Sequence, residues 1–326
     1  MNHPAVTFRS FEQRDVPALL ELWEAESGWG QLTESDWRAW NLDSPYGAAI
    51  IVVAEDEHHA VAGQAVFSRA RVIVDGKDVS AVRLSAPILR ADLRSAALRS
   101  RDHPVIGLYW AGIELARRDG VELVFARPAA TWEAFFRAMQ RLVPWTPGAT
   151  EFCPRVIEGM MCVERAADAG PVPMPPDITV DTVVADDEFD DLWSRASRSL
   201  PVYCGAVRDA VFMEFRNGRF QTYGTRSASG ELMGYVSVDL TTRLIVDSLG
   251  VTVDALRQSL VAVVHTVLRD HPGLLKAMET PLLANVLTEL DFVPNDYRFL
   301  LVCDWLDGAR DASPIALERW HVGVHD

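Results

Sequence analysis

A strand, an arginine-rich loop, a helix and a second strand follow one another between residues 79 and 131. In the first part, apolar side chains alternate with others, as in a strand with one buried face: Val82, Leu84, Ala86 and Ile88 against Arg83, Ser85 and Pro87. After the loop, apolar residues recur at helical spacing: Val105, Leu108, Tyr109, Gly112, Ile113, Leu115 and Ala116. Two arginines and Gly120 end this helix, and residues 121–125 predict the next strand.

This order predicts a βαβ unit that can hold an anion where its helix begins. The first amides of a helix lack partners within the helix, and the helix dipole places partial positive charge there. The preceding loop, residues 90–103, is rich in arginine. The stretch is therefore the best place in the chain for a phosphorylated cofactor.

Composition narrows the class of protein. The chain has 326 residues, 49% of them hydrophobic, which is enough for two cores. A net charge of −15 argues against a general basic surface for nucleic acid. No apolar run approaches the ~20 residues of a membrane helix, and the N-terminus has no signal-peptide pattern. The four cysteines lack metal-ligand spacing. We expect a cytoplasmic, bacterial-type protein with reduced thiols, no metal site and no membrane contact.

The chain repeats its order of elements. Residues 166–176 contain four prolines and no apolar period, which predicts a linker. On each side of it the patterns predict helices, an antiparallel hairpin, a strand–helix–strand unit, a further helix and a closing strand. We therefore predict an α/β protein of two domains, residues 1–165 and 177–326, that share an architecture rather than a sequence.

Several stretches resemble one known family, the Gcn5-related N-acetyltransferases (GNAT), here in tandem. In the first half they are Arg9, Asp15 and Leu19, the hairpin IVVAEDEHHAVAG and the strand GVELVFARP; in the second half they are DDLW, VRDAVFMEFR, ELMGYVSV and IVDSL. The resemblance implies two GNAT-like domains, each a central mixed sheet flanked by helices. It also implies that the first domain holds the acyl donor and that a degenerate second domain completes the substrate groove.

The expected phosphate loop departs from the family pattern. GNAT proteins close backbone amides around a pyrophosphate with a glycine-rich turn, but His103 and Val105 stand where glycines are expected, and Gly107 is the nearest glycine. Either Arg99, Arg101 and His103 supply charge in place of amides, or coenzyme A (CoA) binding is weakened or lost. The resemblance also places Ser85 and Ala86 on the strand whose main chain binds the donor; the alternative is that they are ordinary strand residues.

The sequence offers few candidates for a catalytic acid or base. The family's acid tyrosine is missing, since AFFRAMQ and NVLTELDF occupy the corresponding stretches. Tyr109 could replace it or be a core residue. Glu26, in a segment with four tryptophans, could accept the amine proton or be an exposed helix-end charge. Tyr203 lies in the expected substrate-facing loop of the second half, beside a cysteine without an identifiable histidine partner.

The resemblance implies an N-acyltransferase that moves an acyl group from a pantetheine thioester, acetyl-CoA or another acyl-CoA, to the amine of a small molecule by direct attack. Three alternatives remain open: a phosphopantetheine donor on an acyl carrier protein, an aminoacyl-tRNA donor, and a non-catalytic binding protein. The missing glycine loop favours the carrier protein, and the negative charge disfavours tRNA. The acceptor is not identified by the sequence.

Overall fold

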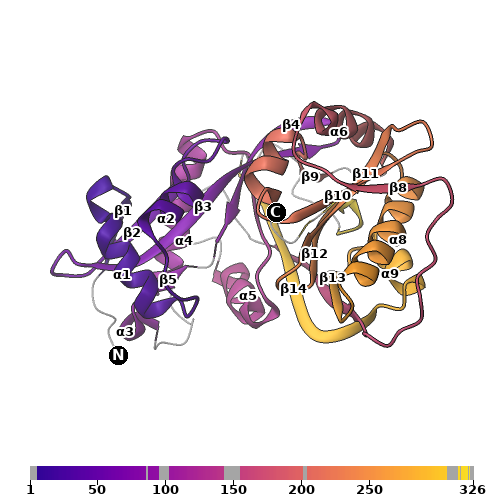
Figure 1. Ribbon diagram of the computed structural model, residues 1–326. Coiled ribbons are helices and arrows are strands. Elements are labelled where there is room, and N and C mark those ends of the chain that lie inside the picture. The colour runs from indigo at the N-terminus through magenta and orange to yellow at the C-terminus, as the bar shows by residue number, and fades with distance from the viewer. Residues whose placement is uncertain are drawn as a thin grey trace. The chain divides into compact units, whose positions relative to one another are not determined.

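The computed structural model describes residues 6–85, 87–94, 103–142, 155–200, 204–306, 315, 317–321 and 323. The chain forms two compact units. Unit 1 comprises Met1–Arg71, Val79–Ile157 and Leu300–Pro314, and unit 2 comprises Val72–Asp78, Glu158–Phe299 and Ile315–Asp326. Figure 1 traces the chain from indigo at the N-terminus to yellow at the C-terminus. Each unit contains a mixed β-sheet with helices, as the sequence predicted.

Unit 1 is built on one mixed sheet. Its strands lie in the order β1 (Thr7–Ser10), β2 (Ile50–Glu55), β3 (Val61–Val74), β4 (Lys77–Leu84), β6 (Leu123–Ala126) and β14 (Val293–Trp305). Strands β4 and β6 run parallel, whereas β1–β2, β2–β3 and β6–β14 are antiparallel. The short strand β5 (Ile88–Leu89) also pairs with β3.

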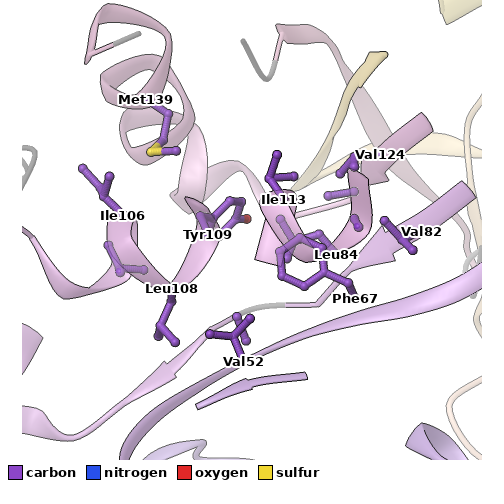
Figure 2. Close-up of a cluster of buried hydrophobic side chains, with 14 of the residues drawn as sticks. Val52, Phe67, Val82, Leu84, Ile106, Leu108, Tyr109, Ile113, Val124 and Met139 are labelled. Atoms are coloured by element: carbon purple, nitrogen blue, oxygen red, sulfur yellow. The ribbon is translucent and has the colours of Figure 1, made fainter. Parts of the chain in front are cut away.

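Helices cover both faces of this sheet. Alternate residues of β2 explain how, because successive side chains of a strand point to opposite faces. Ile50, Val52 and Ala54 belong to the core cluster beneath α4 (Pro104–Arg118) and α5 (Glu133–Leu142), part of which Figure 2 shows. Ile51 and Val53 pack with α1 (Val16–Glu26) and α2 (Glu34–Asn41). Short helical turns complete the unit: η1 (Gln13–Asp15), α3 (Ala91–Arg94) and η2 (Ala130–Trp132).

Unit 2 repeats the plan. Its strands follow the order β7 (Arg155–Arg165), β13 (Leu275–Met278), β12 (Leu244–Gly250), β11 (Leu232–Asp239), β10 (Gln221–Arg226) and β8 (Thr179–Thr182). One hydrophobic cluster contains α8 (Val253–Asp270) and α9 (Ala284–Glu289), and a second contains α6 (Asp187–Ser199) and α7 (Ala210–Phe212). Strands β9 (Cys204–Ala206) and β15 (Trp320–His321) pair with each other, and η3 (Met213–Asn217) and η4 (Leu317–Arg319) are short turns.

Two segments do not follow the linear order of the expected domains 1–165 and 177–326, which stay a prediction. The end of β3 pairs with β9 and belongs to unit 2. The last part of β14 pairs with β6 and belongs to unit 1. Long-range strand pairing decides both assignments, and hydrophobic period gives no information about it. The expected linker, residues 166–176, packs in part on unit 2, where Val172 is buried and its carbonyl lies 2.6 Å from His265 Nδ1.

The strand expected over residues 82–88 is interrupted. Strand β4 ends at Leu84, and Ile88 and Leu89 form β5, which pairs with Gln64 and Gly63 of β3. Ala86 lies outside the described residues. Among the helices of the described residues, none has both the length and the apolar character needed to cross a bilayer.

A glycine fixes the seat of α4 on the sheet. A Cβ at Gly112 would lie 2.0 Å from the ring of Phe67, which is fully buried on β3. The ring has no free space to move into, because it also packs edge to face against Tyr109 at 6.3 Å between centroids.

We predict that Gly112→Ala destabilises the protein by about 1–3 kcal/mol through overpacking. In an open helix the same change would stabilise by up to about 1 kcal/mol. Urea unfolding measures the difference, with Glu114→Ala, exposed on the same helix, as the control. A Gly112→Ala variant as stable as the parent would show that Phe67 does not hold α4 at this distance.

Candidate functional site

The pairing between the two parallel strands of unit 1 ends where the candidate site lies. Strand β4 pairs with β6 from Ala81–Leu123 to Arg83–Phe125, and on its other edge β6 pairs with β14 from Leu123–Trp305 to Ala126–Val302. A narrow cavity of about 10 Å³ lies at this point, close to the smallest volume that holds a water molecule. It is lined by Leu84, Tyr109, Val124, Phe125, Ala126, Phe136, Val302, Cys303 and Asp304.

Tyr109 reaches this cavity from α4. Its side chain is 2% exposed and packs edge to face against Phe135 and Phe136, with centroids 5.2 and 6.1 Å away. Burial raises the pKa of the Tyr109 hydroxyl well above its usual value. No hydrogen bond to this hydroxyl is found among the described residues. A neutral phenol that has no hydrogen-bond partner among the described residues therefore belongs to the lining of the cavity, beside the phenylalanines where the family's tyrosine was expected.

This burial predicts a pH effect on stability. The unfolded chain ionises Tyr109 near pH 10, while the folded chain keeps the proton, so stability falls as the pH rises above about 10. In Tyr109→Phe this loss should shrink by about 1 kcal/mol at pH 11. Denaturant titrations at pH 8 and pH 11 measure it. Tyr297→Phe, which alters an exposed ring, is the control, and an unchanged slope in Tyr109→Phe would contradict the burial of the hydroxyl.

The first backbone amides of α4 already donate hydrogen bonds to His103. Its Nδ1 accepts from the Val105 N–H at 3.2 Å, and its carbonyl accepts from the N–H groups of Ile106 and Gly107 at 2.8 and 3.2 Å. Pro104 has no N–H to offer. A phosphate could therefore use the first amides of α4 only if His103 turned away.

Gly107 and Val105 are engaged in packing. A Cβ at Gly107 would lie 2.2 Å from the ring of Phe8, and Val105 is buried in the core cluster. The glycine is thus explained by the close approach of β1 to α4. Donor binding by His103, Val105 and Gly107 stays a prediction.

The described arginines of the loop are held in ion pairs. Arg90 Nη1 donates to Asp56 Oδ2 at 2.9 Å and helps hold the pKa of Asp56 at about 2; Arg90 also pairs with Asp92 at 2.8 Å. Arg94 pairs with Glu26. These cations are therefore committed to the fold, whereas Arg99 and Arg101 lie outside the described residues.

Glu26 connects α1 to the loop that follows β5. Its Oε1 accepts from the Ala91 N–H at 3.0 Å, and its other oxygen pairs with Arg94. A carboxylate held in this way must break these contacts to accept a proton, so the role of Glu26 as a base stays a prediction. Ser85 is half-buried, and its N–H donates to the Val66 carbonyl at 2.9 Å, which extends the β3–β4 hairpin.

In unit 2, the neighbouring residues Arg208 and Asp209 both make structural contacts. Asp209 caps α7 by accepting from the Phe212 N–H at 2.9 Å. Arg208 is fully buried and pairs with Asp247 at 3.0 Å, and the Tyr235 hydroxyl donates to the same carboxylate at 2.6 Å. Tyr203 lies outside the described residues.

The strand edge of unit 2 that corresponds to the cavity of unit 1 is covered by the same unit's C-terminal residues. Strands β12 and β13 pair at Leu244–Lys276. Further along β12, His321 Nε2 lies 2.8 Å from the Ser248 carbonyl, and a Cβ at Gly323 would lie 2.6 Å from Asp247 Oδ1. This edge of β12 is therefore closed to a donor.

The turn from β12 into α8 is also closely packed, and an amide of its first turn is already hydrogen-bonded within the unit. A Cβ at Gly250 would lie 2.3 Å from the Leu256 amide nitrogen, and Thr252 caps α8 through the Ala255 N–H. Together, the covered edge and the closely packed turn favour unit 1 as the donor site.

We predict that Asp247→Asn costs about 3–5 kcal/mol of stability, because Arg208 would remain buried without a counter-charge. Asp181→Asn, which breaks a half-exposed pair with Arg226, should cost less than about 1 kcal/mol. Thermal and urea unfolding compare the two variants. Equal small effects would show that the buried pair does not hold this part of unit 2.

Sequence reasoning missed three cavity residues, Val302, Cys303 and Asp304. They lie near the C-terminal end of the sequence, far from Leu84, and the pairing of β14 with β6 brings them to the site. No local pattern signals this contact.

No protein-family model and no curated protein matches the chain. Solved structures do resemble it. A probable N-acyltransferase from Enterococcus faecalis V583 has a TM-score of 0.66 at 11% identity, over 93% of this chain and 73% of that one. A tandem GNAT protein from the clavulanic acid biosynthesis pathway has a TM-score of 0.55 at 17% identity, over 93% and 99%.

A third resemblance is to N-myristoyltransferase from Saccharomyces cerevisiae with bound myristoyl-CoA, with a TM-score of 0.57 at 10% identity, over 93% of this chain and 79% of that one. At these identities the likeness concerns the fold. The chain has a tandem GNAT-like fold, as the sequence motifs predicted.

Proposed function

We propose that the protein is an N-acyltransferase that moves an acyl group from a pantetheine thioester, bound by unit 1, to the amine of a small molecule. The observation that carries the proposal is the end of the β4–β6 pairing at Arg83–Phe125, where Leu84 of β4, residues of β6 and Tyr109 of α4 line one cavity. The tandem GNAT-like fold and the N-acyltransferase and N-myristoyltransferase names of its structural neighbours support it.

The chemistry needs a positioned thioester, a neutral amine and a proton donor. The amine nitrogen attacks the carbonyl carbon and forms a tetrahedral intermediate, from which the carbon–sulfur bond breaks. The leaving thiolate takes the proton of the Tyr109 hydroxyl, the new ammonium loses a proton to water, and Tyr109 regains one from solvent. Positioning supplies most of the rate, because an activated thioester and a free amine react readily once aligned.

A carrier-protein donor is the second candidate. At the start of α4, His103 accepts from the Val105 N–H and its carbonyl accepts from the next two amides. A pyrophosphate would have to displace these bonds, whereas phosphopantetheine on a carrier protein has no pyrophosphate to place there. The bound myristoyl-CoA of the yeast neighbour favours free CoA. An aminoacyl-tRNA donor is disfavoured by the net charge of −15.

We expect acetyl-CoA to bind at one site per chain and to raise the melting temperature. A ligand at a hundredfold excess over its Kd stabilises the folded state by about 2.7 kcal/mol. Calorimetry gives the stoichiometry, and thiol release in the presence of an amine panel gives activity. Tyr109→Phe should bind acetyl-CoA normally and lose about a hundredfold or more in kcat, while Tyr223→Phe, a buried tyrosine of unit 2, should keep activity.

The other outcomes discriminate the alternatives. Binding of acyl carrier protein without binding of CoA would favour the carrier donor. Binding of neither, with no thiol release, would favour a non-catalytic binding protein. The double variant Arg99→Ala with Arg101→Ala tests whether the charge of the loop contributes to donor binding. His103 is left intact in this variant, because it caps α4 and its loss would by itself lower the stability by about 1 kcal/mol.

A further inference from the structure

Three tryptophans form an exposed aromatic cluster at the end of α1. Trp29 and Trp40 are 64% and 45% exposed, and Trp23 is half-buried between them. The Trp23 ring lies 5.2 Å from Trp29, tilted by 52°, and 6.2 Å from Trp40, in an edge-to-face arrangement. We call Trp23, Trp29 and Trp40 the tryptophan cluster. Large exposed aromatic groups of this kind are costly on a soluble surface and usually mark a binding site.

The loop that carries Trp29 is folded back onto α1 by its own hydrogen bonds. Trp23 Nε1 donates to the Gly30 carbonyl at 3.0 Å, and the Trp29 N–H donates to Ser27 Oγ at 3.0 Å. Gly28 and Gly30 have φ values of 74° and 83°, which glycine adopts without strain. The rings are thus held by local backbone structure and not only by contact with one another.

A carboxylate is tied to the same loop. Gln31 Nε2 donates to Glu24 Oε1 at 2.8 Å, and Gly30, the residue before Gln31, accepts from Trp23 Nε1 at 3.0 Å. Among the described residues, Glu24 has no Lys or Arg partner and accepts only from the neutral amide of Gln31. Residues 16–43 carry a negative charge overall, with one cation, Arg38, against these acidic residues: Glu21, Glu24, Glu26, Glu34, Asp36 and Asp43.

Indole faces and a carboxylate without a described cationic partner select the same kind of ligand. The negative face of an aromatic ring attracts a cation, most strongly at tryptophan, and quaternary or alkylated ammonium groups also bury apolar surface there. A bare metal ion would gain little from the rings, and an anion would be repelled by Glu24. The net charge of −15 raises the local concentration of cations.

We propose that the tryptophan cluster, with Glu24, binds an organic ammonium group. Resting on the proposed function, we further infer that this group belongs to the acceptor and is not the nitrogen that is acylated. A site that stabilises an ammonium raises its pKa, whereas the attacking amine must be neutral. The acceptor is therefore a compound with two basic nitrogens, one held as a cation and one free to react. Glu26, at the end of α1, accepts from the Ala91 N–H of α3, so this end of α1 lies beside the segment that follows β4 and β5.

Choline and neohexanol test the binding site, because neohexanol replaces the quaternary nitrogen by a neutral carbon of the same shape. Proton NMR titration follows the ligand methyl signal, which moves upfield over an indole face. We expect choline to bind two- to about fivefold more tightly than neohexanol. Trp29→Ala and Trp40→Ala should each abolish the upfield shift, and Glu24→Gln should weaken choline by up to about fivefold without affecting neohexanol.

Tyr297→Ala, which removes an exposed ring of unit 2, should leave choline binding unchanged. Equal affinity for choline and neohexanol would reduce the cluster to an apolar patch and overturn the proposal. Absence of binding by choline, or binding that survives both tryptophan changes, would overturn it as well.

Cadaverine and pentylamine test the identity of the acceptor. Cadaverine has two equivalent amines, so either can react while the other stays as an ammonium group, which gives a statistical factor of about two in kcat/KM over pentylamine. We expect a ratio well above about two in the parent and a ratio of about two in Trp29→Ala. A ratio of about two in the parent would overturn the acceptor inference while leaving the proposed acyl transfer intact. Choline binding without any thiol release would instead retain the cation site and reject the proposed function.

Discussion

The pairing of β4 with β6, and its end at Arg83–Phe125, is the constraint on which the candidate site depends. A small cavity lies where this pairing ends, lined by Leu84 of β4 and by residues of β6 and β14. Packing from above determines what else lines it, because α4 is seated by Gly112 against Phe67 and so brings Tyr109 to the cavity. A larger residue at position 112 would displace the helix and the phenol together.

The two units share an architecture but differ at the corresponding strand edge. In unit 1 residues of β4, β6 and β14 line a small cavity beside an aromatic cluster. In unit 2 the comparable edge of β12 is covered by His321 and Gly323, and the buried Arg208–Asp247 pair lies beneath. Burying such an ion pair removes water from both charges, and this free-energy penalty is offset only when the remaining hydrogen-bonding groups of the pair have partners. Tyr235 provides one of these hydrogen bonds. In unit 2 these contacts therefore stabilise a covered strand edge, where unit 1 has a cavity.

The charged side chains of unit 1 fall into two groups, arginines held in ion pairs and a carboxylate without a described cationic partner. The described arginines around the β5–α3 region are neutralised by Asp56, Asp92 and Glu26, so they add little field for a phosphate. Glu24, in contrast, has no Lys or Arg partner among the described residues and is tied by Gln31 to the loop that carries Trp29. This part of the unit 1 surface is therefore suited to a cationic group of the acceptor, and a donor's phosphates would have to bind elsewhere on the unit.

The sequence by itself determined the class of fold, the repeated order of elements and the position of α4, because period and end signals are local properties of the chain. It also indicated Tyr109 as a possible acid. Only the tertiary structure decided that β14 returns to unit 1 with Val302 and Cys303, that His103 accepts from the first amides of α4, and that Gln31 ties Glu24 to the loop that carries Trp29. These facts depend on strand pairing and side-chain contacts between residues that local patterns do not relate.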